Sequence, residues 1–415
     1  MPPAPTKRTL VIAGAGIAGL TAAIALCKAG FRVIVMERAE ARRTEGAGIQ
    51  LSPNAFKILD DLGIGKMLRS AASFPAHIAL HSAKSGQLLN RFELGDTARQ
   101  RHGAPYAVIH RGDLTALLAA HCASFENIEI RYGEEVLDTA THANGVTVLS
   151  HVATVTTETS AKGLIIANGV WSTLSNLVPG RAIPAFSGQI AWRATALNDG
   201  TVPDGLAEDA THLWMAPHAH LVSYGMRMGR EVNLVAVTPW QGQSEPTKGR
   251  TVSLDERNIF DRHFSRWHEP IRDFVTDGAL RWKGWPLFAA KAPKALHNGP
   301  IALIGDAAHA MLPYAAQGGA QAIEDALVLA ACCAESHDDL TMAFTAYAAK
   351  RRKRVAQVMA TARQNRQIYH LGWPMSFARD TVLRLTPQER LQQRMDWIYG
   401  WQTEANLSSN NNTTG

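Results

Sequence analysis

Three glycines behind a short apolar run constrain the fold of this chain more than any other feature. Gly14, Gly16 and Gly19 follow the apolar residues 10–13 and open a helix-like stretch that ends near Lys28. The first glycine permits a tight turn, the second lets the backbone approach a pyrophosphate, and the third lets the helix pack closely on the strand. The helix amino terminus also directs partial positive charge at phosphates. This spacing predicts a Rossmann-type dinucleotide-binding unit.

A carboxylate after the next expected strand supports the same interpretation. Residues 32–36 lead to Glu37, about 20 residues after the turn, where a carboxylate can accept both hydroxyls of an adenosine ribose. The alternative is a secretory signal, because Lys7 and Arg8 precede the uncharged residues 9–27. Three glycines would interrupt the apolar core of such a signal, and Glu37 would have no purpose in it. We therefore favour the dinucleotide.

A second glycine-rich turn near residue 305 narrows the choice of ligand. The buried-strand run 301–304 ends at Gly305 and Asp306, and Gly318 and Gly319 precede another expected helix. A carboxylate at a strand end can bind a second ribose-like chain, and the helix amino terminus can hold an oxygen that carries negative charge. A nicotinamide dinucleotide seldom needs this second site, whereas an isoalloxazine ring with its ribityl chain does. The two turns together indicate a flavin.

Composition sets milder limits. The chain has 415 residues, of which 46% are hydrophobic, so it can bury a large core and is expected to form two domains. No apolar stretch except the glycine-broken one approaches the length of a membrane span. Its four cysteines form no CxxC pair and no cluster with histidine, which predicts a reduced, cytoplasmic protein without a metal site.

The formal net charge of +6 suits an anionic ligand, but it could equally reflect solvated faces such as the basic run 351–354. These basic residues lie on an expected helix without interleaved aromatic residues, so we do not expect nucleic-acid binding. We also expect no stable membrane insertion, and a monomer or homodimer.

The pattern along the chain predicts an α/β fold with interleaved segments. The alternating segment 77–92 predicts a hairpin. Evenly spaced runs rich in aromatic and β-branched residues predict a mostly antiparallel sheet between about residues 183 and 286. Strands are expected at residues 129–131, 145–149, 164–166, 189–196, 212–215, 220–226 and 231–238, and helices at 55–62, 114–122, 259–264, 321–333 and 342–367.

These elements suggest a discontinuous domain organisation. Residues 1–75, 100–182 and 287–340 would form a Rossmann-type FAD-binding domain. Residues 76–99 and 183–286 would form a β-sheet domain for the substrate. Residues 341–407 would form carboxy-terminal helices, and the polar tail 408–415 is expected to be disordered.

Up to about residue 370, the chain resembles the class A flavoprotein monooxygenases, which are single-component FAD-dependent aromatic hydroxylases, and especially their salicylate hydroxylase-like branch. The first glycine turn and Glu37 carry part of the match. The rest lies in GAGIQLSPNA from Gly46, in HRGDL with Arg111, and in GDAAHAMLPYAAQGGAQAIEDA over residues 305–326.

The resemblance implies a role for each cofactor-binding residue. Glu37 would hold the adenosine ribose, Arg111 the phosphate region, and Asp306 the ribityl chain or the pyrophosphate. Pro313 would border the isoalloxazine. The predicted cofactor-binding set comprises Gly14, Gly16, Ala18, Gly19, Glu37, Arg38, Gly48, Ile49, Arg111, Asn168, Asp306, Pro313, Gly318, Gly319 and Ala320.

The chain departs from the family pattern in one motif. Members usually have Asp-Gly, often followed by arginine, where this chain has Asn168-Gly169 and then Ser175 and Asn176. Asparagine can accept a hydrogen bond, but it has no charge to hold an arginine or a nicotinamide ribose. The departure therefore bears on the use of NAD(P)H more than on FAD binding.

The resemblance also implies the chemistry. NADH or NADPH would reduce FAD, oxygen would be captured as a flavin C4a-hydroperoxide, and a small aromatic acid or phenol would be hydroxylated. A phenolate attacks such an oxygen better than a phenol does, so a base or hydrogen-bond acceptor is expected near the substrate hydroxyl.

Two alternative functions remain. One is an FAD monooxygenase that acts on a heteroaromatic, polyketide-like or alkene substrate, and the other is a flavin-binding sensor or accessory protein that is impaired in reduction.

Three residues are candidates for catalysis. His220 and Tyr224 would point to one face of a strand, and an H-x-x-x-Y strand resembles one in salicylate and hydroxybenzoate hydroxylases. They could instead be polar residues of a half-exposed edge strand. Gln317 could orient the substrate or peroxide, or it could only cap a helix. We expect His309 to be a packed histidine and not a base.

Two arginines and a proline are candidates for substrate binding. Arg193 and Arg227 could each pair with a substrate carboxylate, or with a carboxylate of the protein surface. Pro313 would contact the substrate from the flavin loop.

Overall fold

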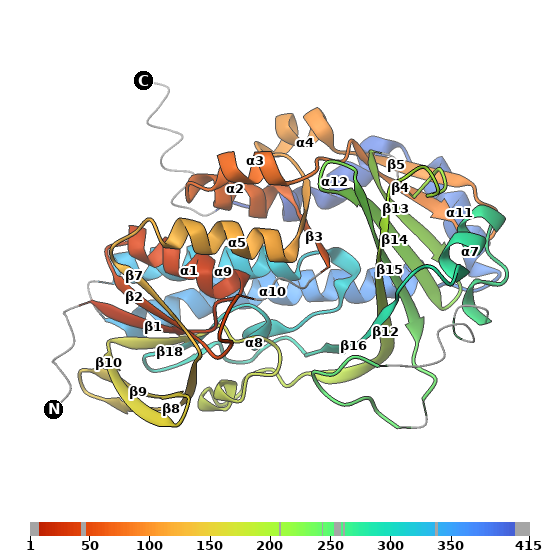
Figure 1. Ribbon diagram of the computed structural model, residues 1–415. Coiled ribbons are helices and arrows are strands. Elements are labelled where there is room, and N and C mark those ends of the chain that lie inside the picture. The colour runs from red at the N-terminus through yellow and green to blue at the C-terminus, as the bar shows by residue number, and fades with distance from the viewer. Residues whose placement is uncertain are drawn as a thin grey trace, which may run out of the picture.

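Two large β-sheets stand side by side in the computed structural model (Figure 1), which describes residues 8–42, 47–206, 209–242, 244–252, 259, 262–336 and 339–402. The first sheet has six strands in the order β17-β18-β11-β1-β2-β7, all parallel except β17. Their bounds are β1 Thr9–Ala13, β2 Arg32–Glu37, β7 Ile128–Tyr132, β11 Gly163–Ile166, β17 His297–Asn298 and β18 Ile301–Leu303. The α/β class and this buried parallel sheet agree with the sequence prediction.

Helices cover one face of the six-stranded sheet, and a small sheet covers the other (Figure 1). The helices are α1 (Ile17–Lys28), α5 (Arg111–Cys122) and α9 (Gly318–Glu335). The small antiparallel sheet has the order β10-β9-β8, with β8 Glu134–His142, β9 Gly145–Val152 and β10 Val155–Ala161. The sequence predicted only part of β9 and neither β8 nor β10; in β10, residues 155–158 are all exposed, so the strand lacks the apolar alternation of a half-buried strand.

The second large sheet has seven strands in the order β16-β12-β15-β14-β13-β4-β5. All neighbours are antiparallel except β13 and β4, so the predicted mostly antiparallel sheet and the hairpin at residues 77–92 are confirmed. The bounds are β4 His77–Ser82, β5 Leu88–Glu93, β12 Ala185–Leu197, β13 Ala210–Ala216, β14 Ala219–Met226, β15 Glu231–Pro239 and β16 Lys283–Ala289.

The two faces of this seven-stranded sheet pack on different partners. Trp192 and Leu221 lie on the outer face, where they share a core with Ile271 of α7 (Glu269–Thr276). Ala191 and Val237 lie on the inner face, against the loop that follows the second glycine turn. The helix predicted at residues 259–264 agrees with the structure at 259 and 262–264, which are helical, while 260 and 261 lie outside the described residues, as does the tail 408–415.

Shorter elements complete the fold. Strand β3 pairs with β6 beside the junction of the two large sheets. The bounds are β3 Gly48–Leu51, β6 Ala107–His110, α2 Pro53–Asp61, α3 Gly65–Ala71, α4 Gly95–His102, η1 Leu174–Leu177, α8 Asp306–His309, η2 Pro313–Ala315, α11 Met375–Leu385 and α12 Gln388–Tyr399. Within the described ranges, no helix combines the length and apolar character required to cross a bilayer.

The long helix α10 (Leu340–Tyr369) joins the two halves. Its first turns pack in the core of the six-stranded sheet through Phe344, and Ala362 near its end packs on the inner face of the seven-stranded sheet. In its middle, Arg351 is fully buried and bridges Glu324 at 2.6 Å and Asp325 at 2.7 Å, both on α9.

The basic run 351–354 is therefore only half solvated. Arg354, one turn after Arg351, is also buried and lies 2.9 Å from Glu324, while Arg352 and Lys353 are exposed. The prediction of a solvated face is wrong for Arg351 and Arg354, because residues three apart share one helix face and this face meets two buried carboxylates.

Replacing Arg351 should test the contribution of this bridge to stability. Arg351→Ala leaves two carboxylates buried without their shared cation, so the free energy of unfolding should fall by about 3–5 kcal/mol. Arg352→Ala, on the exposed side of the same helix, should change it by less than about 0.5 kcal/mol. Equal losses in urea denaturation of the two variants would contradict the assignment.

Candidate active site

The first glycine turn has the shape that the sequence predicted. Gly14 has a φ of +107°, and a methyl group added there would lie 2.8 Å from the carbonyl oxygen of Ala167. A methyl group on Gly19 would overlap the carbonyl oxygen of Gly14. At Gly16, by contrast, an added methyl group would meet nothing within 4 Å. The turn is therefore closed toward the protein and open where a ligand would approach.

The carboxylate of Glu37 is fixed at this turn by two backbone donors. It accepts hydrogen bonds from the amide of Ala15 at 2.9 Å and from that of Ala39 at 3.1 Å. Its neighbour Arg38 is exposed instead, and its guanidinium lies 3.9 Å from Glu135. Of the two, only Glu37 lies against the glycine turn.

The two glycine turns meet in space. Gly305 has a φ of +60°, and a methyl group added there would lie 3.0 Å from the Cβ atom of Ala18 on α1. The next residue, Asp306, begins α8 with an exposed side chain. Among the described residues, no group hydrogen-bonds its carboxylate. A free carboxylate at the contact of two glycine turns fits the ribityl and pyrophosphate region of FAD.

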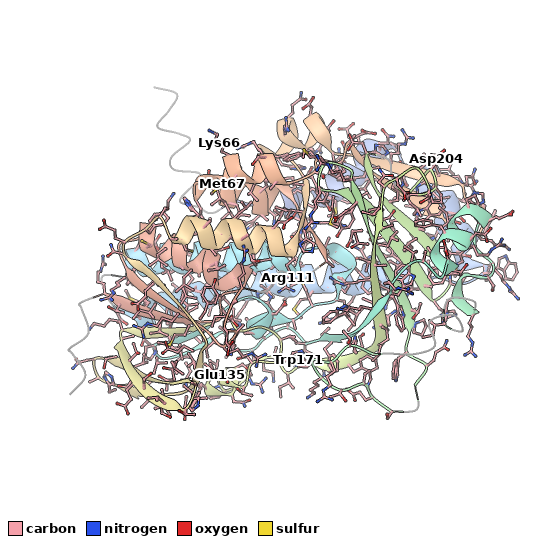
Figure 2. All side chains as sticks on the ribbon, viewed as in Figure 1. Lys66, Met67, Arg111, Glu135, Trp171 and Asp204 are labelled. Carbon is pink, nitrogen blue, oxygen red and sulfur yellow. The ribbon has the colours of Figure 1, made fainter. Side chains whose placement is uncertain are left out.

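Two further exposed polar side chains border this region. Arg111 begins α5 and lies in the middle of the molecule, between the two large sheets (Figure 2). Asn168 follows β11, whose last residue Ile166 pairs with Ala13 at the end of β1. The described part of the chain offers no hydrogen-bond partner to either side chain. The loop after Asn168 then reaches the other sheet, since Trp171 packs on Phe288 of β16 with ring centroids 4.6 Å apart.

On the side expected for the isoalloxazine, β3 lies between the start of α9 and the seven-stranded sheet. A methyl group on Gly319 would lie 2.6 Å from Cδ1 of Ile49, and one on Gly48 would lie 2.5 Å from the Tyr224 ring. One added at Gly318 would meet nothing within 4 Å. Pro313, the first residue of η2, is exposed, whereas Ala320 is buried. Gly46, which begins this motif in the sequence, lies outside the described residues.

Asn233 is a site residue that sequence reasoning missed. It is buried on β15, and its Oδ1 accepts a hydrogen bond from the amide of Gly48 at 3.0 Å, while its Nδ2 is buried without a partner. The available signal was an amide residue in the middle of an apolar strand, which a protein rarely buries without a hydrogen bond.

The inner face of the seven-stranded sheet brings three of the predicted residues together. Arg193 on β12 pairs across with Val235, which pairs with Val222 on β14. His220 and Tyr224 lie two residues on either side of Val222. Cross-strand neighbours and alternate residues share a face, so all five side chains point the same way. Arg193, His220 and Tyr224 therefore surround two partly exposed valines.

The charge of Arg193 has no counterion among the described residues. No hydrogen bond or ion pair holds it there, and its Nε atom is buried and unpaired. Burial, together with the charge of Arg111, lowers its pKa, and Tyr224 acts in the opposite direction. Burial raises the pKa of Tyr224. A half-buried cation with a buried, unpaired Nε, close to a phenol and a second arginine, will favour an anionic ligand.

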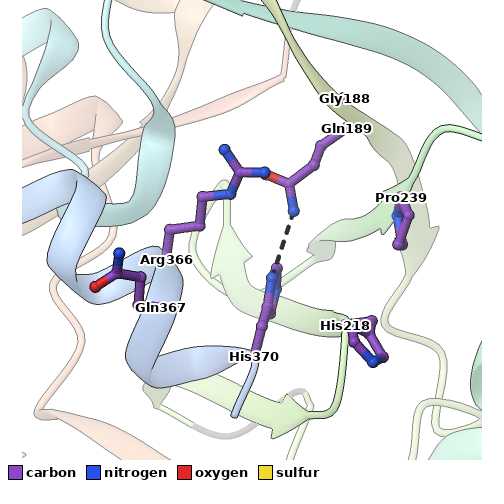
Figure 3. A pocket seen from close by; sticks show the side chains of 7 residues that line it. All are labelled: Gly188, Gln189, His218, Pro239, Arg366, Gln367 and His370. Atoms are coloured by element: carbon purple, nitrogen blue, oxygen red, sulfur yellow. Dashed lines mark hydrogen bonds between the residues drawn. The ribbon is translucent and has the colours of Figure 1, made fainter. Parts of the chain in front are cut away.

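His220 is buried and contacts the carboxy-terminal end of α10. Its Nδ1 lies 2.9 Å from Nε2 of His370, and its ring packs against Tyr314 and Tyr369 with centroids 5.0 and 5.6 Å away. Burial and His370 hold the pKa of His220 well below its usual range. His370 also lines a pocket of about 370 Å³ (Figure 3). The other lining residues are Gly188, Gln189, His218, Pro239, Arg366 and Gln367.

Gln317 and Arg227 are engaged with other groups. The buried Gln317 donates to Ser52 Oγ at 2.8 Å and accepts from Asn54 at 3.3 Å, and its side chain does not cap α9. Arg227 is an exposed residue that pairs with Glu231 at 2.8 Å and with Asp113 at 3.5 Å. This surface pairing is the alternative that the sequence left open for Arg227.

His309 is buried and lies 2.5 Å from Asp325, which agrees with a packed histidine.

Comparison with known proteins agrees with this geometry. The family model described as "FAD binding domain" matches residues 7–362. The chain is 33% identical to a 3-hydroxybenzoate 6-hydroxylase of Klebsiella oxytoca over 95% of this chain and 97% of that protein. It is 31% identical to a 6-hydroxynicotinate 3-monooxygenase of Pseudomonas fluorescens over 86% and 90%. A crystal structure of a Klebsiella pneumoniae HpxO variant complexed with FAD superposes with a TM-score of 0.80, at 25% identity over 94% and 97%.

The chain therefore belongs to the FAD-binding domain family and is a class A flavoprotein monooxygenase. Its fold is similar to that of a salicylate hydroxylase, with a TM-score of 0.79 at 22% identity over 95% of this chain and 96% of that one. FAD is its cofactor, as the two glycine turns predicted. The residues fit the cofactor for two reasons. The first glycine turn is open at Gly16. In addition, no described residue is a hydrogen-bond partner for the side chains of Asp306, Arg111 and Asn168.

The role of Asp306 can be tested by titrating apoprotein with FAD and following flavin fluorescence. Asp306→Ala should weaken FAD binding roughly ten- to a hundredfold, because a charge-assisted hydrogen bond contributes about 1.5–3 kcal/mol. Glu158→Ala removes an exposed carboxylate of β10 and should leave the affinity unchanged. An unaltered Kd in Asp306→Ala would refute the assigned cofactor contact.

Proposed function

We propose that this monooxygenase hydroxylates a small aromatic acid that carries a ring hydroxyl. The reaction consumes one O2 and one NAD(P)H with a proton, and it releases NAD(P)+ and water while one oxygen atom enters the ring. NADH or NADPH is the electron donor typical of the family. Bound FAD supplies the electrons and the oxygen activation for this chemistry.

The observation that carries the proposal is the unpaired guanidinium of Arg193 on the inner sheet face. An aromatic acid is anionic at neutral pH, and a carboxylate would provide the charge-assisted hydrogen bonds that Arg193 lacks among the described residues. The partly exposed Val222 and Val235 offer an apolar floor for the ring. His220 and Tyr224 flank this floor and would contact the ring hydroxyl.

The surrounding residues would orient the ring and exclude water. Gly48 brings β3 against the Tyr224 ring, and a side chain at this position would push the two apart. Tyr314 and Tyr369 pack around His220. Excluding water matters in this chemistry, because activated oxygen that meets solvent is lost as hydrogen peroxide.

A heteroaromatic hydroxy acid is the second candidate substrate. The similarity to a 6-hydroxynicotinate 3-monooxygenase favours it. Such a ring bears the same carboxylate and the same ring oxygen, so Arg193, His220 and Tyr224 would serve it equally well. Products heavier by one oxygen atom, from parallel incubations with hydroxybenzoates and hydroxynicotinates, would distinguish the two.

Anaerobic reduction separates an enzyme from a flavin-binding sensor. We expect NADH or NADPH to bleach the oxidised flavin spectrum of the holoprotein, and an aromatic hydroxy acid to accelerate this reduction. If the oxidised spectrum persisted with both nucleotides and all acids, the chain would be a binder and the proposed function would be wrong.

Two arginine variants test which cation binds the carboxylate. Arg193→Gln should raise KM for an aromatic acid roughly ten- to a hundredfold, because a hydrogen bond to a charged group contributes about 1.5–3 kcal/mol. Arg227→Gln should leave KM unchanged, since Arg227 already pairs with two surface carboxylates. The opposite result in steady-state kinetics would move the carboxylate site to Arg227.

A further inference from the structure

A chain of four side chains runs from the flavin loop to His220. The hydroxyl of Tyr314 donates a hydrogen bond to Oε1 of Gln189 at 2.7 Å. Nε2 of Gln189 lies 3.4 Å from Nδ1 of His370 (Figure 3). Nε2 of His370 lies 2.9 Å from Nδ1 of His220. No local sequence pattern indicates this series of hydrogen bonds, because its members come from β12, β14, η2 and the end of α10.

The chemistry of the amide fixes the direction of every bond. The oxygen of Gln189 is occupied by Tyr314, so an NH2 group faces His370, and such a group only donates. Nδ1 of His370 must therefore accept. A neutral imidazole carries a single N–H proton, so in His370 this proton lies on Nε2, and the Nε2–H group donates a hydrogen bond to His220. Nδ1 of His220 then accepts, and its own proton lies on Nε2.

Both imidazoles are neutral at neutral pH. Burial, together with the nearby charges of Arg366, His218 and Arg379, lowers the pKa of His370 to about 4. The other groups packed around the pair are Tyr314 and Tyr369, whose pKa values burial raises, so both phenols are uncharged. No carboxylate faces the pair among the described residues, so nothing there favours a second proton on either ring.

We propose that Gln189 and His370 are positioning residues that hold His220 as the Nε2–H tautomer, which makes it a hydrogen-bond donor to the ring oxygen of the substrate. A donor at this place binds phenolate better than phenol, so the hydroxyl proton passes to solvent as the substrate binds. His220 thus stabilises the activated substrate instead of acting as its base. This inference rests on the proposed function for its substrate and on the hydrogen-bond chain for its tautomer.

Nitrogen-15 NMR of histidine-labelled holoenzyme tests the tautomer without any substrate. His220 is assigned by the signals that disappear in His220→Asn. We expect a protonated Nε2 and an unprotonated Nδ1 at pH 7. The reverse pattern, or a doubly protonated ring, would overturn the proposal in the wild-type protein alone.

One substitution should reverse the direction of the hydrogen bonds that connect residue 189, His370 and His220. In Gln189→Glu, the carboxylate accepts from Nδ1 of His370, so Nε2 of His370 becomes an acceptor and the His220 proton moves to Nδ1. His370→Gln retains an amide NH2 that can donate to His220 and should preserve the wild-type tautomer. An unchanged His220 signal in a folded Gln189→Glu protein would overturn the inference.

A 3-hydroxy-4-nitrobenzoate probe reports the consequence at the site, because it carries the carboxylate that Arg193 would bind and its phenolate absorbs visible light. Near the pKa of the free probe, the bound wild-type protein should hold at least about tenfold more phenolate relative to phenol than Gln189→Glu does. His370→Gln should resemble the wild type. Equal ionisation in all three proteins would contradict a donor role. Failure of the probe to bind, with the tautomer as expected, would count against the proposed function and leave the tautomer assignment standing.

Discussion

The buried bridge from Arg351 to Glu324 and Asp325 is the interaction on which the cofactor side of the molecule depends. Asp325 accepts a hydrogen bond from the amide of Gly305 at 2.9 Å, so the bridge fixes the second glycine turn. Glu324 accepts from Asn54 at 2.6 Å, and Asn54 in turn bonds Gln317. Because these carboxylates are completely buried, their negative charge persists only beside a cation, which is Arg351 for both and also Arg354 for Glu324. Arg351 is thus linked to both ends of the loop 305–317, which we propose borders the flavin.

The helix that carries Arg351 also connects this loop to the substrate face. From Arg351, α10 runs on to Asn365 and Tyr369, and both donate hydrogen bonds to the carbonyl oxygen of Tyr314, at 3.0 and 3.3 Å. His370 follows immediately and contacts His220. A single helix is therefore linked to the loop 305–317 near both of its ends, and it leads directly to the residue that contacts His220 on the seven-stranded sheet. This arrangement gives a physical reason for cofactor and substrate geometry to vary together.

Sequence reasoning succeeded where a local backbone requirement has one solution. The glycine turns at Gly14 and Gly305 need positive φ angles and close packing, which leave a readable spacing. It failed where a role depends on a distant partner. Arg351 was indistinguishable in the sequence from the other members of a basic run, and Gln189 and His370 carry no local signal, because strand register and helix packing decide which groups they contact. The sequence also showed that Asn168 departs from the family pattern, and the structure leaves its side chain exposed next to the first glycine turn.

A crystal structure of the holoenzyme with an aromatic hydroxy acid tests the central claim most directly. The claim is that Arg193 binds the carboxylate while the ring rests on Val222 and Val235. We predict a carboxylate oxygen about 3 Å from the guanidinium of Arg193, and the ring oxygen at a similar distance from Nε2 of His220. A ligand whose carboxylate contacts Arg227 or solvent, with Arg193 still unpaired, would contradict the account.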